Sequence, residues 1–269
     1  MTEFWELLSY PFVTRALIVG TLVSLCASTL GVVLTLKRYA LIGHGLSEVA
    51  FASFSLSVAL GLPPLLFSAP LVILASFAIL YVSQRRRVGG DIAIAVAGSA
   101  ALSVGALATA LSGGPGADAY GYLFGSILAM TESDVLLSAA LALVVLSLFL
   151  LFYNRLFLIA ESEDYARSLG LNVPFYQALI SILTALTVVL GMRMIGTLLI
   201  SSLIILPSVT ARRLLASSGF RALVVASAVL SLLCFFAGFF LSFLWDLPTG
   251  ASIVGVNLVL LLLAGVARR

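Results

Sequence analysis

Long apolar segments alternate with short polar breaks along the chain. Nine apolar segments can be recognised, at about 12–36, 41–61, 64–83, 92–112, 134–157, 174–192, 194–211, 219–245 and 250–267. A helix that crosses a bilayer needs roughly 18 or more apolar residues, and no series of short alternating segments typical of barrel strands is present. The pattern predicts an all-α polytopic membrane protein, a bundle of about eight to nine transmembrane helices, with eight if one segment is a shorter buried helix.

The composition supports the same class. Of the 269 residues 62% are hydrophobic and 9% are charged, and the mean hydropathy is +1.23. A water-soluble domain of this length has far more polar surface to cover. Because no hydrophilic stretch is long enough for a second domain, we expect one membrane domain over residues 1–269.

The basic residues indicate how the helices are oriented. If the segments alternate from an N-terminus outside the cell, twelve of the 14 Lys and Arg fall on one side, and only Arg15 and Arg193 fall on the other. Short loops rich in Lys and Arg stay in the cytoplasm, so the C-terminus is expected there. This placement accounts for the net charge of +3 without a nucleic-acid partner.

The segment "SGGPGADAYGYLFGSILAMTESD" lies between the fourth and fifth predicted helices, on the outer side. Its apolar part, Tyr120 to Met130, is too short to cross a bilayer. Two arrangements fit: a helix at the interface with its tyrosines at headgroup depth, or a re-entrant segment packed against the bundle. We favour the interfacial helix.

The longest polar segment, "NRLFLIAESEDYARSLGLNVP", lies between the fifth and sixth predicted helices, on the cytoplasmic side. Ser162 is a good N-cap residue, and Glu163 and Asp164 fall in the first turn, where the helix dipole favours acids. Gly170 is suited to the position after the last turn. These residues predict a short cytoplasmic helix at about 162–170.

One face of this short helix combines apolar residues. Tyr165 and Leu169 are four residues apart and therefore share a face beside Ala166. Such a face could dock into a groove on another protein. An ordinary cytoplasmic loop with one helical turn is the alternative.

The stretch "YALIGHGLSEVAFASFSL" places His44 and Glu48 in an apolar segment. A carboxylate near the middle of a membrane costs roughly 2.5–3.5 kcal/mol on insertion scales, so it usually faces the bundle interior and has a partner. An imidazole four residues away lies on the same helix face. Nitrogen and oxygen donors together suit Zn²⁺, Mn²⁺ or Fe²⁺ better than Mg²⁺ or Ca²⁺.

Two further residues are weaker candidates for this metal site. Ser47, a water molecule or a residue of another helix could complete the ligand shell, and a transport site should stay incomplete so that the ion is released. Asp91 fits a helix N-cap better than an exit-path ligand. The competing interpretation of His44 and Glu48 is a hydrogen-bonded pair that only holds helices together.

Five segments of the chain resemble, in order, the membrane permease subunit of the bacterial zinc/manganese/iron-type metal-ion ABC importer family. They are "LIGHGLSEVAFAS", "YLFGSIL", "DYARSLG", "MIGTLLISSLIILPSVTARRL" and "LPTGASIVGVNLVLLL". The third is similar to the E-A-A-x-x-x-G coupling loop, with Tyr165 at an alanine position. In the first, the family's usual G-D-x-x-x-H order is inverted, because His44 takes the acidic position and Glu48 the histidine position. This inversion leaves the metal preference open.

The resemblance implies a protein of the bacterial cytoplasmic (inner) membrane that imports a divalent transition-metal ion, with zinc favoured and manganese or iron possible. It implies three partners: a separate ATP-binding cassette ATPase, an extracytoplasmic metal-binding protein and a second copy of the chain. Contact with the ATPase would fall on Glu163, Asp164, Tyr165, Ala166, Leu169 and Gly170.

The chain itself is not expected to be an enzyme. It has no G-x-x-x-x-G-K-[ST] phosphate loop, so ATP hydrolysis would take place in the partner. Neither a zinc-protease H-E-x-x-H motif nor a catalytic triad is apparent. We expect no permanently bound cofactor, only the transported metal ion. The alternative function is a secondary transporter or ion channel that uses His44 and Glu48 as a proton or ion relay.

Overall fold

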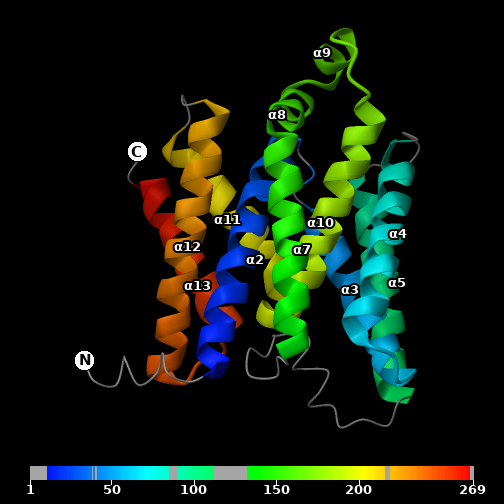
Figure 1. The fold of residues 1–269 in the computed structure, drawn as a ribbon, viewed down its shortest axis with the longest axis vertical. Coiled ribbons are helices and arrows are strands. Elements are labelled where there is room, and N and C mark those ends of the chain that lie inside the picture. Colours follow the sequence, from blue (N-terminus) through cyan, green and yellow to red (C-terminus); the bar gives the residue numbers. More distant parts are fainter. Residues whose placement is uncertain are drawn as a thin grey trace.

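The computed structural model describes residues 11–37, 39, 41–84, 90–111, 132–215 and 219–266. Within these residues every regular element is an α-helix (Figure 1). The helices are α2 (Pro11–Leu36), α3 (Ile42–Ala59), α4 (Pro64–Gln84), α5 (Gly90–Leu111), α7 (Glu132–Leu151), α8 (Tyr153–Glu161), α9 (Glu163–Ser168), α10 (Val173–Ile195), α11 (Thr197–Leu214), α12 (Phe220–Trp245) and α13 (Thr249–Val266). The predicted all-α class is confirmed, and the segment from Tyr120 to Met130 lies outside the described residues.

The predicted count of eight to nine transmembrane helices is not confirmed. Among the described residues, six helices are long and apolar enough to cross a membrane, or seven if α7 and α8 together form one bent span. The helices α3 and α11 are not among them, although each has 18 residues. α3 is the more polar of the two, because it carries His44, Glu48 and four serines.

α2 and α10 form the centre of the bundle. Over the most apolar 18 residues of each helix, 72% of the residues are buried in both α2 and α10. The buried share is only 28% in α4 and 22% in α5. α3 packs against α4, α5, α10 and α11, so most of its surface faces protein rather than lipid. A helix enclosed in this way can carry polar side chains, because neighbouring helices satisfy them.

Small residues let the central helices approach closely. A Cβ atom at Gly31 of α2 would lie 1.9 Å from the carbonyl oxygen of Ile204 in α11. α2 also accepts two hydrogen bonds from α12, because the hydroxyls of Ser227 and Ser231 donate to the backbone carbonyls of Ser28 and Ser24, each at 3.1 Å. Close packing and interhelical hydrogen bonds of this kind are the usual cohesive forces within a membrane.

The segment predicted as one transmembrane helix over 134–157 is divided by a sharp bend. α7 ends at Leu151, and α8 continues at an angle of 70°. Aromatic contacts and one polar bond hold α8 in place: the Phe157 and Phe220 ring centroids lie 4.7 Å apart, and Arg155 donates a hydrogen bond of 2.6 Å to the Tyr176 hydroxyl. As a result, α8 turns away from α7 and α9 projects beyond the end of the bundle (Figure 1).

Candidate metal site and projecting helix

His44 and Glu48 lie together at the start of α3. The backbone N–H of His44 donates to the Leu41 carbonyl at 3.0 Å, which places His44 in the first turn. The pair is therefore near the end of α3 that follows the α2–α3 connection. The distance between His44 Nε2 and Glu48 Oε1 is 3.5 Å.

The two side chains differ in exposure. The His44 side chain is 49% exposed, whereas that of Glu48 is 16% exposed. The imidazole thus opens to the outside of this single chain, and the carboxylate lies deeper, against α5. Within 3.5 Å of each other, the nitrogen and the oxygen are close enough to bind one ion, with one side of the pair left open.

Gly98 of α5 makes room for the carboxylate. A Cβ atom at position 98 would lie only 1.8 Å from Glu48 Oε2. Further along the same contact, Gly45 lies against Ile94, and Gly105 lies against Phe51 and Ala52. The glycines thus set the close approach of α3 and α5, and Gly98 in particular shapes the space that Glu48 occupies.

The weaker candidates contribute less to this arrangement. Ser47 is 1% exposed, and its hydroxyl donates to the backbone carbonyl of His44 at 2.7 Å. The side chain of Asp91 lies outside the described part of the chain. Among the side chains that the structure describes, no cluster of three or more His, Cys, Asp or Glu could hold a metal. The described part of one copy therefore offers two candidate donors, and an ion bound between them would need further ligands.

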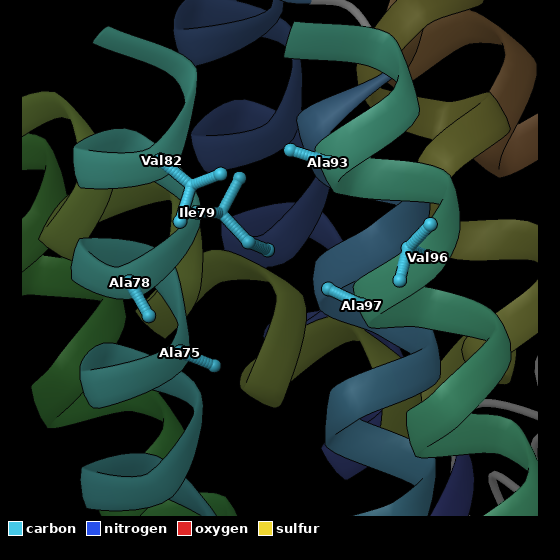
Figure 2. Close-up of a pocket in the computed structure, with 7 residues that line it drawn as sticks. All are labelled: Ala75, Ala78, Ile79, Val82, Ala93, Val96 and Ala97. Atoms are coloured by element: carbon cyan, nitrogen blue, oxygen red, sulfur yellow. The ribbon is translucent and has the colours of Figure 1, made fainter. Parts of the chain in front are cut away.

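A separate groove between α4 and α5 contains no metal donors. Its volume is about 430 Å³, and Figure 2 shows the side chains of both helices around it. The lining residues are all apolar: Ala75, Ala78, Ile79, Val82, Ala93, Val96 and Ala97. Alkyl groups cannot replace the water ligands of a cation, so the groove is not a binding site for a metal ion.

The ends of α9 agree with the prediction from the sequence. Ser162 is the N-cap, and its hydroxyl accepts a hydrogen bond from the Tyr165 N–H at 3.3 Å. At the other end, the N–H of Gly170 donates to Arg167 and the N–H of Leu171 donates to Ala166. This is a Schellman motif, and Gly170 has the positive φ of 78° that the motif requires.

The residues of α9 point in different directions. Tyr165 and Leu169 are 56% and 54% exposed, so they form an apolar patch at the tip of the projecting helix. Asp164 beside them is also exposed. Ala166, by contrast, is fully buried and holds α9 against the rest of the protein. Of the three residues predicted to share one face, Tyr165 and Leu169 are therefore exposed, and Ala166 is buried.

Glu163 faces the bundle. Its Oε1 atom lies 2.9 Å from Lys37 Nζ and accepts a hydrogen bond of 2.7 Å from the Gln177 amide. Burial alone would raise the pKa of Glu163, but Lys37, with smaller contributions from Gln177 and Arg167, lowers it below the ordinary value of 4.5. The pKa of Lys37 is lowered by burial, and the hydrogen bond and charge of Glu163 oppose this by raising it. Glu163 therefore anchors α9, and nothing in the sequence pattern indicated Lys37 as its partner.

The lowered pKa of Glu163 predicts a stability that depends on pH. A carboxyl whose pKa is lower in the folded state stabilises the fold above its unfolded pKa, and this stabilisation is lost as the pH falls through the folded pKa. We expect the difference in melting temperature between the wild type and Glu163→Gln to stay constant from neutral pH to about 5, and to shrink below 4.5. Thermal unfolding in detergent measures it. A difference that is independent of pH would contradict the ion pair.

A bundle of apolar helices around one polar helix, with a short helix projecting from its end, defines a multi-pass membrane protein built like a transport permease. The chain belongs to the ABC 3 transport family, whose model matches residues 9–268. This membership confirms the resemblance to permeases of metal-ion ABC importers.

Several relatives are similar over nearly the whole chain. The high-affinity zinc uptake system membrane protein ZnuB of Haemophilus influenzae is 29% identical, over 89% of this chain and 91% of that protein. The manganese transport system membrane protein MntC of Halalkalibacterium halodurans is also 29% identical, over 97% and 89%. Among solved structures, PsaBC from Streptococcus pneumoniae in complex with Fab has a TM-score of 0.87 and 26% identity, covering 98% of this chain and 94% of that one.

Proposed function

We propose that this chain is the membrane-spanning subunit of a bacterial ABC importer that carries a divalent transition-metal ion into the cytoplasm. The observation that carries the proposal is the His44–Glu48 pair, with its atoms 3.5 Å apart in an enclosed helix of an ABC 3 family member. ATP hydrolysis takes place in a separate subunit, because the family relatives are membrane proteins of transport systems.

Zinc is the favoured cargo, and manganese and iron are the alternatives. An imidazole nitrogen and a carboxylate oxygen are common ligands of these ions. Two copies of the chain facing each other would supply two imidazoles and two carboxylates, and the two negative charges would balance the ion. The 49% exposure of His44 in a single copy supports such a homodimer, because the open side of the pair is where a second copy can approach.

The membrane arrangement follows from the same proposal. α3 and α11 cross the membrane inside the bundle, which gives nine crossings when each of the long helices α2, α3, α4, α5, α7, α10, α11, α12 and α13 is counted. The odd number places the start of α2 and the end of α13 on opposite sides of the membrane, and the excess of Lys and Arg favours the cytoplasm for the end of α13. α9 then projects on the cytoplasmic side, where its Tyr165–Leu169 patch contacts the ATPase, and an extracytoplasmic protein delivers the metal at the opposite end.

The direct test is metal uptake by vesicles that contain the chain with its ATPase. We expect zinc or manganese to accumulate only when ATP is supplied on the side where the ATPase lies, and to continue when an ionophore removes the proton gradient. Accumulation that follows the proton gradient and needs no ATP would instead show a secondary transporter that uses His44 and Glu48 as a relay.

Gly98→Ala is expected to reduce metal uptake by about tenfold to 100-fold, as loss of support for a metal ligand ordinarily does. The added methyl group would displace the Glu48 carboxylate, from which it would lie 1.8 Å. The matched control is Gly105→Ala, which meets Phe51 and Ala52 in the same helix contact but not Glu48. An equal loss in both variants would show that helix spacing, and not the position of Glu48, is responsible.

A further inference from the structure

Lys37 is an unusual residue for its position at the end of α2. It directly follows Leu36, the last residue of that helix, and its side chain is only 4% exposed. A buried ammonium group needs a partner, because an unpaired charge in such a place is strongly destabilising. Its partner is Glu163, the first residue of α9, at 2.9 Å. The ion pair therefore joins the end of α2 to the start of the projecting helix.

α9 cannot hold its position alone. It has six residues, and isolated helices shorter than roughly 12–15 residues are marginal in water. Three contacts fix it to the bundle: the Lys37–Glu163 ion pair, the hydrogen bond from Gln177 of α10 to the same oxygen of Glu163, and the buried Ala166. A displacement of α9 must therefore strain these contacts or move the groups on their other side.

Lys37 is also closely linked to the metal site. His44 follows it by seven residues, and the described residues between α2 and α3 make backbone hydrogen bonds to both helix ends. The N–H of Tyr39 donates to Leu34, the N–H of Ile42 donates to Tyr39, and the N–H of His44 donates to Leu41. A connection with this many internal hydrogen bonds transmits a displacement better than a loosely held loop would.

We propose that the Lys37–Glu163 ion pair transmits movement of α9 through the α2–α3 connection to the His44–Glu48 pair. The ATPase pushes or pulls α9 at its exposed patch, Lys37 follows Glu163, and the first turn of α3 shifts with it. Lys37 and Glu163 are positioning residues that neither bind the metal nor contact ATP. This inference rests on the proposed function.

The test separates coupling from assembly. The wild-type complex with its ATPase and the variants Lys37→Met and Glu163→Gln are reconstituted in liposomes, and zinc uptake and phosphate release are measured on the same vesicles. In the single variants we expect zinc taken up per ATP hydrolysed to fall by about fivefold or more, within the usual range of coupling between sites. The charge exchange Lys37→Glu with Glu163→Lys should restore most of the ratio.

Two controls make the outcome specific. Glu161→Gln removes an exposed acidic charge two residues before Glu163 and should keep the wild-type ratio. The charge-exchange variant could fail to assemble with the ATPase. In that case the double variant Lys37→Met with Glu163→Gln is used, because it leaves no unpaired charge. It should assemble, but its ratio of zinc taken up to ATP hydrolysed should stay low. Wild-type ratios in the single variants or in this neutral pair would overturn the inference. So would an assembled exchange variant that is no better than the single variants, or a loss explained entirely by less assembled complex.

Failure of the proposed function would look different. If the wild-type complex takes up neither zinc nor manganese in an ATP-dependent manner, the importer function itself is wrong. If the wild-type complex transports metal and the variants transport it with an unchanged ratio, only the role of Lys37 and Glu163 is wrong.

Discussion

His44→Ala and Glu48→Ala are each expected to reduce ATP-dependent metal uptake by at least about 100-fold, because loss of groups that merely support a ligand already costs roughly 10–100-fold. In the proposed site each copy contributes His44 and Glu48, whose nitrogen and oxygen atoms lie 3.5 Å apart. Removal of either donor leaves a single ligand from that copy. The measurement is the initial rate of zinc or manganese uptake per assembled complex in vesicles.

A serine on the same helix provides the control for this experiment. Ser53 is buried in α3, and its hydroxyl donates a hydrogen bond of 2.9 Å to the Ala50 carbonyl within the same helix. Ser53→Ala should therefore keep near-normal uptake. The amount of ATPase that copurifies with each variant should equal that of the wild type, because neither His44 nor Glu48 belongs to the exposed Tyr165–Leu169 patch. Normal uptake by both alanine variants would reduce the pair to a packing interaction and remove the basis of the proposed metal site.

Tyr165→Ala and Leu169→Ala are expected to weaken binding of the ATPase by at least about tenfold each. Both side chains are more than half exposed at the tip of α9, and complete burial of a large apolar side chain in an interface contributes roughly 1.5–3 kcal/mol. A free-energy loss of about 1.4 kcal/mol already corresponds to a tenfold change in affinity. The affinity of the purified permease for the purified ATPase in detergent measures this.

The matched control for the α9 patch is an exposed leucine outside α9. Leu60, directly after the last residue of α3, is 60% exposed. In the proposed arrangement α3 ends on the side of the membrane opposite α9, so Leu60→Ala removes a similar apolar group away from the ATPase. Its affinity for the ATPase should not change. If Tyr165→Ala and Leu169→Ala bind as tightly as this control, the exposed patch of α9 is not the ATPase contact.

Local features of the candidate site could be predicted from the sequence. The ends of α9 depend on Ser162 as a cap and Gly170 at a positive φ, and both effects act within a few residues. The spacing of His44 and Glu48 places them on one face of any helix that contains them. The apolar segments predict helices in a membrane, because backbone groups in lipid must be satisfied internally.

Other features were not accessible to sequence reasoning. The 70° bend after Leu151 depends on the packing of α8 against the aromatic residues of α10 and α12. The enclosure of α3 by α4, α5, α10 and α11, which lets it carry polar side chains, is likewise a tertiary feature. Gly98 is one of 22 glycines in the chain, and nothing in its local sequence shows that it faces Glu48, 50 residues earlier.

The sequence by itself determined the class of the protein, its family, the ends of its projecting helix and the pairing of an imidazole with a carboxylate, because these follow from interactions over a few residues or from long apolar segments. Only the tertiary structure decided that Gly98 leaves room for Glu48, that Glu163 turns inward to Lys37, and that Tyr165 and Leu169 point outward. These contacts join residues that are distant in the chain, and helix packing alone brings them together.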